Sequence, residues 1–289
     1  MNTFTGNDIL SSRNHIKNEK RFGLIGDPIK GSLSPLLFNA GYDGRYAYDL
    51  IEGQDFETSY QKFIDGYEGI NVTAPFKEQA FRKADVRDAT CEKTGAANLL
   101  VKKDGGITAY NTDYTGIQMS LLKAAENDRQ VWRTALVVGC GGAGKAAAVA
   151  VGDLRLKTVL MNRNMERAEE IARRLPEYGF EVRPLDDFRK CFRKADVIIY
   201  TLPGKIDAID SLDGRDFRGG RFSGKRKFIL EANYKTPSFG PSVLERMHKA
   251  NDLAVYISGT EWLLYQAVGG YGIFTGEMPD AEKMRKVLK

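Results

Sequence analysis

A lysine stands where a helix should begin in the segment N-V-T-A-P-F-K-E-Q-A, residues 71–80. Val72 and Thr73 are typical of a strand end. Pro75 suits the first turn of the helix that follows, because proline needs no backbone partner there. Lys77 would then lie in that first turn, where the positive end of the helix dipole disfavours a cation. A surface lysine gains nothing from this position, so we expect Lys77 to have a chemical role.

Two other polar residues occupy similar places. Lys77, Asn98 and Asp113 all follow or end predicted strands of one α/β unit, and crevices at strand ends are where such sheets bind ligands. A lysine close to an aspartate can pass a proton to or from an alcohol. Each residue also has a structural alternative: a surface lysine, a satisfied turn amide and a helix N-cap, respectively. Their shared location favours a site.

A pair of hydroxyls precedes the first predicted helix. Ser34 stands before Pro35, which predicts an N-cap followed by a first-turn proline. Ser32 is not needed for such a cap. Two hydroxyls one residue apart beside a helix start could instead bind a carboxylate.

A glycine-rich loop follows an apolar strand and opens a helix. Gly139, Gly141 and Gly144 have the spacing G-x-G-x-x-G in the context that the dinucleotide fingerprint requires. The helix N-terminus that follows attracts phosphates. The same residues nearly form a nucleotide-binding P-loop ending at Lys145, but Ala146 stands where that loop needs a Mg²⁺-binding hydroxyl. The pattern favours a dinucleotide over ATP, with a glycine turn needed only for packing as the alternative.

The residues after the next strand indicate which dinucleotide. An NAD site should have an acidic residue there, to hold the ribose 2′-hydroxyl. This chain has Asn162, Arg163 and Asn164, with Arg167 one turn later. A planar guanidinium can face a 2′-phosphate and stack on adenine, so NADP is the predicted cofactor. The alternative is that both arginines are solvated surface residues.

These residues need strands and helices to position them, and the chain alternates the two. Predicted strands of the first part are 21–26, 45–51, 69–73, 96–102 and 106–111. After a polar joint at 126–134, a run of βαβ units predicts a mostly parallel, doubly wound sheet. The tail from 256 to 289 is predicted as helices, with a break at Gly269–Gly270, that pack back on the first part. The fold class is α/β with two domains.

Composition narrows the class of function. The 289 residues are 42% hydrophobic and 28% charged, which suits a folded protein with two domains around one cleft. The net charge of +5 is spread along the chain, which predicts a small anionic ligand and no nucleic acid. Three cysteines and two histidines predict no metal site. No apolar run is long enough for a membrane span, and the polar first twenty residues predict a loose tail and a cytoplasmic protein.

Seven motifs occur in an order that resembles the shikimate dehydrogenase family over nearly all of residues 21–280. They are GLIGDPIKGSLSP, NVTAPFK, TGAANLL, YNTDYTG, GCGGAGKA, NRN and LYQA. The combination is far more specific than any one of them. The resemblance implies an NADP-dependent enzyme that interconverts 3-dehydroshikimate and shikimate in aromatic amino-acid synthesis.

The resemblance also implies roles for individual residues. Lys77 and Asp113 match the catalytic pair. Ser32 and Ser34 match the residues that hold the substrate carboxylate. The substrate-binding set as a whole is Ser32, Ser34, Asn71, Thr73, Asn98, Tyr234 and Gln266. The cofactor-binding set is Gly139, Gly141, Gly142, Ala143, Gly144, Asn162, Arg163, Asn164, Thr201 and Gly259.

The family's organisation implies a substrate domain and a cofactor domain. Residues 1–117 with 257–289 would form the substrate domain, and residues 118–256 a Rossmann-like NADP-binding domain. The expected partner is a small molecule, with no membrane and no nucleic acid, and the expected assembly is a monomer or a homodimer.

Some residues depart from the family pattern. Trp262 stands where a methionine usually lies beside the nicotinamide, and Glu231 begins a shortened loop, E-A-N-Y-K-T-P. Three alternatives stay open: a quinate/shikimate dehydrogenase that prefers NAD, a non-catalytic NADP-binding sensor, and another hydride-transfer enzyme for a small hydroxy acid. Ser32, Ser34 and the absence of an acid at the strand end disfavour the NAD-dependent quinate/shikimate dehydrogenase. The intact Lys77–Asp113 pair disfavours the non-catalytic sensor.

Overall fold

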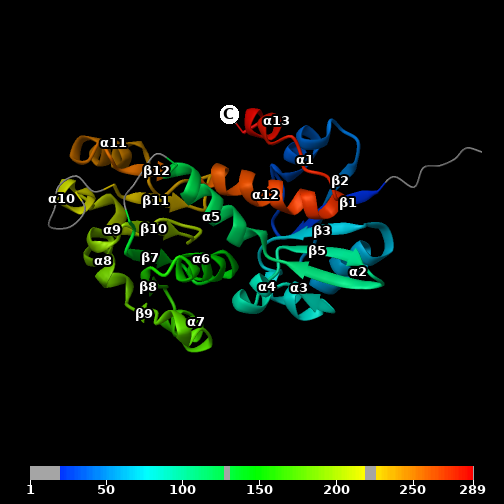
Figure 1. Ribbon diagram of the computed structural model, residues 1–289, viewed down its shortest axis with the longest axis horizontal. Helices are drawn as coiled ribbons and strands as arrows, with labels where there is room; N and C mark the ends of the chain where they lie inside the picture. Colours follow the sequence, from blue (N-terminus) through cyan, green and yellow to red (C-terminus); the bar gives the residue numbers. More distant parts are fainter. Residues whose placement is uncertain (1–19, 127–130, 219–225, 289) are drawn as a thin grey trace, which may run out of the picture.

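The chain forms two lobes, each built around its own sheet (Figure 1). The computed structural model describes residues 20–126, 131–218 and 226–288. Of the predicted N-terminal tail, residues 1–19 lie outside the described residues. Of the polar joint at 126–134, residues 127–130 lie outside them. Within the described ranges, no helix combines the length and the apolar character that a membrane span requires.

The first lobe contains a six-stranded mixed sheet of order β2-β1-β3-β5-β6-β4. Its parallel pairs are β1 with β2, β1 with β3, and β4 with β6, and the other two pairs are antiparallel. The strands are β1 (Arg21–Gly26), β2 (Ala47–Glu52), β3 (Gly69–Val72), β4 (Val86–Arg87), β5 (Leu99–Lys103) and β6 (Gly106–Tyr110). The helices are α1 (Ser34–Tyr42), α2 (Phe56–Gly66), α3 (Lys77–Lys83) and α4 (Ala89–Thr94).

The second lobe is a parallel sheet with helices on both faces. Its strands are arranged in the order β12-β11-β10-β7-β8-β9, and all neighbouring pairs are parallel. The sequence order of the strands reverses between β7 and β10, as in the doubly wound dinucleotide-binding folds. The predicted doubly wound sheet is thus confirmed. The strands are β7 (Thr134–Val138), β8 (Lys157–Met161), β9 (Glu181–Val182), β10 (Val197–Tyr200), β11 (Phe228–Glu231) and β12 (Val255–Ile257). The helices are α6 (Gly142–Asp153), α7 (Met165–Arg174), α8 (Phe188–Lys194), α9 (Asp207–Asp210), α10 (Gly214–Phe217) and α11 (Pro241–Ala250), with short 3₁₀ turns at Pro176–Tyr178 and Leu185–Asp187.

Two long helices join the lobes: α5 (Thr112–Ala124) leaves the first lobe and α12 (Gly259–Thr275) returns to it, side by side with α5 (Figure 1). The short α13 (Ala281–Lys286) follows beside α1. The predicted return of the C-terminal helices to the first lobe is thus confirmed. Phe22 of β1 is fully buried and stacks on Phe274 of α12, with 5.0 Å between ring centroids. The last long helix therefore completes the core under the first strand.

The predicted break at Gly269–Gly270 is wrong, because α12 continues through both residues. A Cβ added at Gly270 would lie 2.9 Å from a methyl carbon of Leu99 on β5, so the glycine lets the helix pack closely on the sheet. The helix ends instead at Gly276, whose φ of 77° is the left-handed conformation typical of a helix C-cap.

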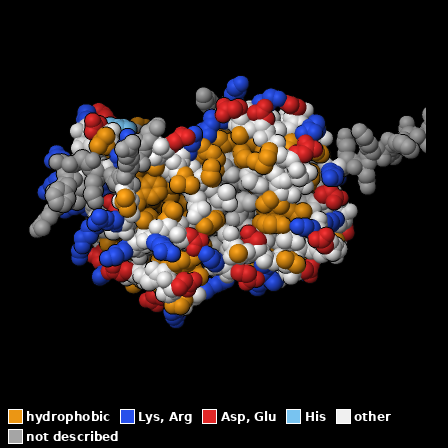
Figure 2. All heavy atoms as spheres, in the orientation of Figure 1, with side chains coloured by type: hydrophobic (Ala, Val, Ile, Leu, Met, Phe, Trp, Pro, Cys, Tyr) orange, Lys and Arg blue, Asp and Glu red, His pale blue; other side chains and the backbone are white. Residues whose placement is uncertain are grey.

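Charged side chains of both signs are intermixed around the two lobes in the view of Figure 2. This face shows no continuous basic stripe. It is therefore in line with the small-ligand prediction from the charge distribution.

Candidate active site

A cleft of about 250 Å³ lies between the lobes. Residues after β1 and β3 of the first lobe face residues after β11 of the second, so the carboxyl ends of both sheets open into the same space. Ligands bind at such ends in α/β folds. The polar residues that line the cleft are Ser32, Ser34, Asn71, Thr73, Lys77, Asn98, Asp113, Tyr234, Lys235, Gln266 and Tyr271. All nine predicted catalytic and substrate-binding residues are among them.

Lys77 and Asp113 form an ion pair inside the cleft. Lys77 is the first residue of α3 and Asp113 the second residue of α5, and the lysine Nζ donates to Oδ2 at 2.5 Å. Their side chains are only 15% and 7% exposed. The pair combines an acid, a base and protection from bulk water, which are the requirements for moving a proton to or from a bound alcohol. Asp113 is not the helix cap, because Asn111 occupies that position.

Pro75 does not begin α3, contrary to the prediction. The Ala74–Pro75 peptide bond is cis, and the chain makes a turn in which the Phe76 N–H donates to the Thr73 carbonyl at 3.0 Å. The helix starts two residues after the proline. Lys77 nevertheless lies in the first turn, as predicted, because it is the first residue of α3.

The two serines form one polar corner of the cleft. Their hydroxyl oxygens are 3.2 Å apart, and Ser32 Oγ also accepts a hydrogen bond from the Ser34 backbone N–H at 3.3 Å. Ser34 is already the first residue of α1, so the predicted N-cap is wrong and Ser32 takes part in the helix start. From the other lobe, Tyr234 lines the same cleft, and burial raises the pKa of its phenol. Tyr234 is therefore a neutral donor at this corner.

Buried amides position the other side of the cleft. Asn98 is 3% exposed, and its side-chain oxygen accepts from the Thr112 backbone N–H at 2.8 Å. Its amide donates to Gln266 Oε1 at 3.0 Å. The satisfied-amide alternative thus describes Asn98 correctly, although the residue also lines the cleft. By holding Thr112, it fixes the first turn of α5 and so the position of Asp113. Asn71 is likewise engaged, accepting from the Tyr48 hydroxyl at 2.8 Å.

A second cavity of about 350 Å³ surrounds the glycine loop. Gly139 has a φ of 106°, and a Cβ there would lie 2.3 Å from Thr201 Oγ1. A Cβ at Gly144 would lie 1.9 Å from the Gly139 carbonyl oxygen, whereas Gly141 at the N-cap of α6 faces open space. The loop therefore has the close packing at the first and third glycines, and the open approach at the second, that a pyrophosphate requires.

The residues after β8 that line this cavity include two arginines and no acidic residue that could hold a ribose 2′-hydroxyl. Arg163 and Arg167 line the cavity and are exposed, and no carboxylate in the described residues pairs with either side chain. The described lining of this cavity contains no Asp or Glu. Asn162 instead holds the glycine loop, accepting from the Cys140 N–H at 3.2 Å, and Asn164 caps α7. This donor set fits a dinucleotide with a 2′-phosphate.

The glycine loop meets the ion pair directly. A Cβ at Gly142 would lie 3.0 Å from Cδ of Lys77, so a side chain at this position would displace the lysine by a few tenths of an ångström. Ala143, Gly259 and Trp262 line the cleft on the same side. Trp262 is 4% exposed, and its indole N–H has no acceptor within the described residues.

Ion pairs connect the lobes at both ends of α6. Beside the site, Lys145 of α6 pairs with Glu78 of α3 at 2.7 Å, which holds the glycine loop against the substrate side of the cleft. At the other end of the helix, Asp153 accepts from Lys93 Nζ of the first lobe at 2.8 Å, and from the Tyr178 hydroxyl of its own lobe at 2.6 Å.

Lys235 is the lining residue that sequence reasoning missed. It lies in the cleft beside Tyr234, on the loop after β11. Its only signal in the sequence is that it follows a predicted substrate contact. A lysine in a loop otherwise has the pattern of a solvated surface residue.

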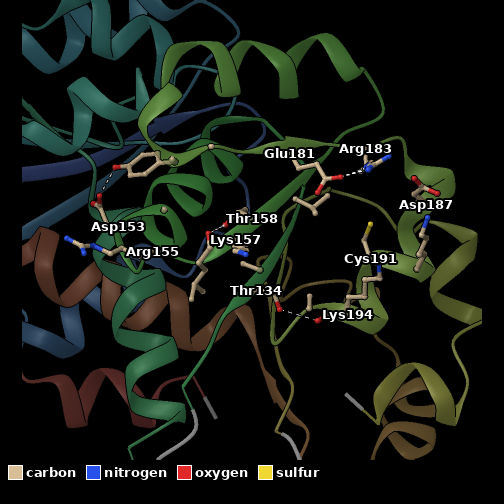
Figure 3. Close-up of a pocket in the computed structure, with 18 of the residues that line it drawn as sticks. Thr134, Asp153, Arg155, Lys157, Thr158, Glu181, Arg183, Asp187, Cys191 and Lys194 are labelled. Atoms are coloured by element: carbon tan, nitrogen blue, oxygen red, sulfur yellow. Dashed lines mark hydrogen bonds and ion pairs between the residues drawn. The ribbon is translucent and has the colours of Figure 1, made fainter. Parts of the chain in front are cut away.

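A larger cavity, of about 930 Å³, lies at the opposite end of the second sheet (Figure 3). It is lined by the amino ends of β7 and β8, whereas parallel sheets bind ligands at their carboxyl ends. Its charges are mixed, and Figure 3 shows Glu181 and Arg183 paired with each other across its upper edge. Size alone does not make it the active site, because the ion pair and the glycine loop lie elsewhere.

Comparisons with known proteins agree with this geometry. The model of the shikimate dehydrogenase substrate binding domain matches residues 24–100, and that of shikimate / quinate 5-dehydrogenase matches residues 123–209. A shikimate dehydrogenase (NADP(+)) of Ignicoccus hospitalis is 36% identical over 266 residues, covering 89% of this chain and 94% of that protein. One of Pyrococcus abyssi is 28% identical over 274 residues, covering 93% and 97%. The solved shikimate 5-dehydrogenase of Thermus thermophilus, in complex with NADP(H) and shikimate, is 25% identical with a TM-score of 0.73, covering 92% and 97%.

Proposed function

The chain belongs to the shikimate dehydrogenase family, and from that premise we propose that it catalyses the NADP-dependent, reversible reduction of 3-dehydroshikimate to shikimate. The observation that carries the proposal is the buried Lys77–Asp113 pair, with Nζ and Oδ2 at 2.5 Å, directly under the glycine loop. A proton-transfer pair and a dinucleotide loop facing one small cleft are what an alcohol–ketone interconversion needs.

The substrate lies in the cleft with its carboxylate at the corner of Ser32, Ser34 and Tyr234. The two serine hydroxyls lie 3.2 Å apart and Tyr234 lines the same cleft from the other lobe, and hydroxyl donors suit a carboxylate. The ring hydroxyls are held by Asn71, Thr73, Asn98 and Gln266, whose polar atoms line the other side.

The glycine loop would hold the pyrophosphate of the cofactor, and Arg163 and Arg167 would hold its 2′-phosphate. NADP, when bound, supplies or accepts the hydride at C3 of the substrate. Thr201 packs under the loop and Gly259 lies beside the cleft, so both keep their proposed places next to the cofactor.

Lys77 moves the proton. In the reductive direction its Nζ donates to the substrate oxygen on which negative charge develops, and its own charge stabilises that oxygen. Asp113 holds the lysine in place by the hydrogen bond to Nζ and accepts from the neighbouring ring hydroxyl. Closure of the cleft by α6 excludes water, which strengthens both interactions.

Replacement of Lys77 by methionine tests this assignment. We expect kcat for shikimate oxidation to fall by about 10²- to 10⁴-fold, the usual contribution of general acid–base catalysis, with a much smaller change in shikimate affinity. Lys83→Met is the matched control, because Lys83 is on the same helix but 41% exposed and paired with Glu57. A normal kcat in Lys77→Met would refute the proposed role.

Initial rates with shikimate and quinate, each with NADP and with NAD, test the substrate and the cofactor. We expect shikimate with NADP to give the highest kcat/KM. Preference for quinate with NAD would indicate the quinate/shikimate dehydrogenase alternative. No activity with any of the four pairs would favour the non-catalytic sensor.

The proposal extends to organisation. Residues 1–117 with 257–289 are the substrate domain and residues 118–256 the cofactor domain. The protein is proposed to be a cytoplasmic monomer or homodimer, a location in keeping with its three free cysteines. Light scattering of the purified protein checks the assembly, and cell fractionation checks the location.

A further inference from the structure

The substrate cleft carries an unbalanced positive charge. Three charged side chains line it in the described part of the chain: Lys77, Asp113 and Lys235. The first two neutralise each other at 2.5 Å. Lys235 has no carboxylate partner among the described residues, so the cleft has a net charge of one positive unit.

The loop that carries Lys235 is fixed in place. Asn233 Oδ1 accepts hydrogen bonds from the backbone N–H groups of Lys235, at 3.2 Å, and of Thr236, at 3.1 Å. The Asn233 amide also donates to the Pro203 carbonyl at 3.1 Å. Such a local side-chain-to-backbone network holds a turn in one conformation. Lys235 is therefore held at the mouth of the cleft by its backbone, although its side chain is exposed.

A buried carboxylate binds the backbone that follows the same loop. Glu231, at the end of β11, is fully buried, and it accepts from the backbone N–H groups of Ser238, at 2.5 Å, and Phe239, at 3.2 Å. The Tyr256 hydroxyl also donates to Glu231, at 2.9 Å. The short loop from 232 to 237 is thus anchored at both ends.

Lys235 reaches the same cleft as the serine corner. Ser32, Ser34, Tyr234 and Lys235 all line it. The two serines belong to the first lobe, whereas Tyr234 and Lys235 follow β11 of the second. Lys235 therefore enters the cleft from the lobe opposite the two serines.

We propose that Lys235 is the counter-ion of the substrate carboxylate and determines the preference of this enzyme for an anionic substrate. The inference rests on the proposed function, because it takes the carboxylate to lie at the serine corner. Hydroxyl groups contribute dipoles, whereas an ammonium group contributes a full charge whose attraction reaches further. Because the cation belongs to the cofactor lobe, binding of the anion also favours approach of the two lobes.

The size of the effect is limited by exposure. An exposed ammonium group is screened by water and salt, so its contribution is well below that of a buried pair. We expect Lys235→Met to raise KM for shikimate about five- to tenfold, with kcat and KM for NADP nearly unchanged. The wild-type KM should also rise with NaCl, and more steeply than that of the variant.

The experiment compares Lys235→Met, Lys235→Arg and Lys190→Met with the full-length wild type. Lys190→Met removes the same charge from the distant large cavity, where Lys190 has no partner among the described residues, so it should behave as wild type. Lys235→Arg keeps the charge and should restore KM to within about threefold. With the methyl ester of shikimate, which lacks the carboxylate charge, wild type and Lys235→Met should have the same kcat/KM.

An unchanged KM for shikimate in Lys235→Met would overturn the assignment. So would an equal loss with the uncharged ester, because Lys235 would then act through the shape of the cleft, or a failure of Lys235→Arg to restore KM. A wild type that neither oxidises nor binds shikimate would refute the proposed function itself, and the Lys235 assignment with it. These outcomes separate the two hypotheses.

Discussion

Lys227 is buried in the second lobe, and its replacement by methionine should change how the stability of the protein depends on pH. Its side chain is 1% exposed. Its Nζ donates to the carbonyl oxygens of Phe192 and Ala195, at 2.7 and 2.5 Å, where α8 ends. Burial lowers the pKa of this lysine to about 7, against the opposing effect of Asp196 and Asp216.

The direction of the effect follows from proton binding. Between pH 7 and the ordinary lysine pKa of 10.5, the unfolded chain keeps the proton on Lys227 and the folded protein has lost it. The unfolded state then binds more protons, so the free energy of unfolding rises as the pH rises through this window. Below pH 7 both states are protonated, and the folded state carries the full penalty of a buried charge.

The magnitude follows by integrating the difference in bound protons. One pKa unit corresponds to about 1.4 kcal/mol, so raising the pH from about 7.5 to about 9.5 should add about 2 kcal/mol to the wild-type stability through this residue alone. Lys227→Met has no proton to lose and lacks this contribution. Its own stability is lowered by a separate, pH-independent amount, because the two carbonyls lose their donor.

The assay is urea unfolding followed by circular dichroism at several pH values across this range. The difference between wild type and variant removes the titration of all groups that they share. Lys190→Met, an exposed lysine variant, should run parallel to the wild type. Parallel curves for wild type and Lys227→Met would refute the reasoning, and a wild-type advantage that falls with pH would mean that the two carbonyls hold the amine in its charged form.

Two further variants test the cofactor cavity and the lobe contact. Arg163→Ala should raise KM for NADP about tenfold or more and KM for NAD much less, because the charge of the guanidinium acts on the 2′-phosphate, which NAD lacks. Arg155→Ala, at the other end of the sheet, is the control, and an equal effect on both cofactors would contradict the assignment. Asp153→Asn should weaken the contact between the lobes by about 1 kcal/mol, since Asp153 of the second lobe accepts from Lys93 of the first. X-ray scattering should then show a larger radius of gyration, and an unchanged radius would contradict this prediction.

The sequence predicted those features that depend on local pattern. The glycine loop, the parallel order of the second sheet and the strand-end positions of Lys77 and Asp113 follow from neighbouring residues in the chain. The three-dimensional arrangement agrees with each of them. The roles of the individual site residues stay predictions until the variants are measured.

The wrong predictions concern residues whose conformation is decided by distant partners. Gly269 and Gly270 normally disfavour a helix by about 1 kcal/mol each, but here the close packing of α12 on β5 at Gly270, together with its contact with α5, offsets that cost. Pro75 was expected inside the helix, and it lies in the turn before it. Lys227 and Lys235 look like any other lysine in the sequence. The burial of Lys227 depends on carbonyls at the end of α8, more than thirty residues earlier, and the placement of Lys235 depends on how its loop meets the other lobe.

The return of α12 to the first lobe has a consequence for synthesis of the protein. Phe22 is among the first described residues, yet its aromatic partner Phe274 is translated some 250 residues later. The second lobe has all its strands by Ile257 and can fold as a unit while the first lobe still exposes an apolar face. The lobe that is translated first is thus completed last, so a ribosome-bound chain stopped before residue 259 should recruit chaperones at α1 and β1.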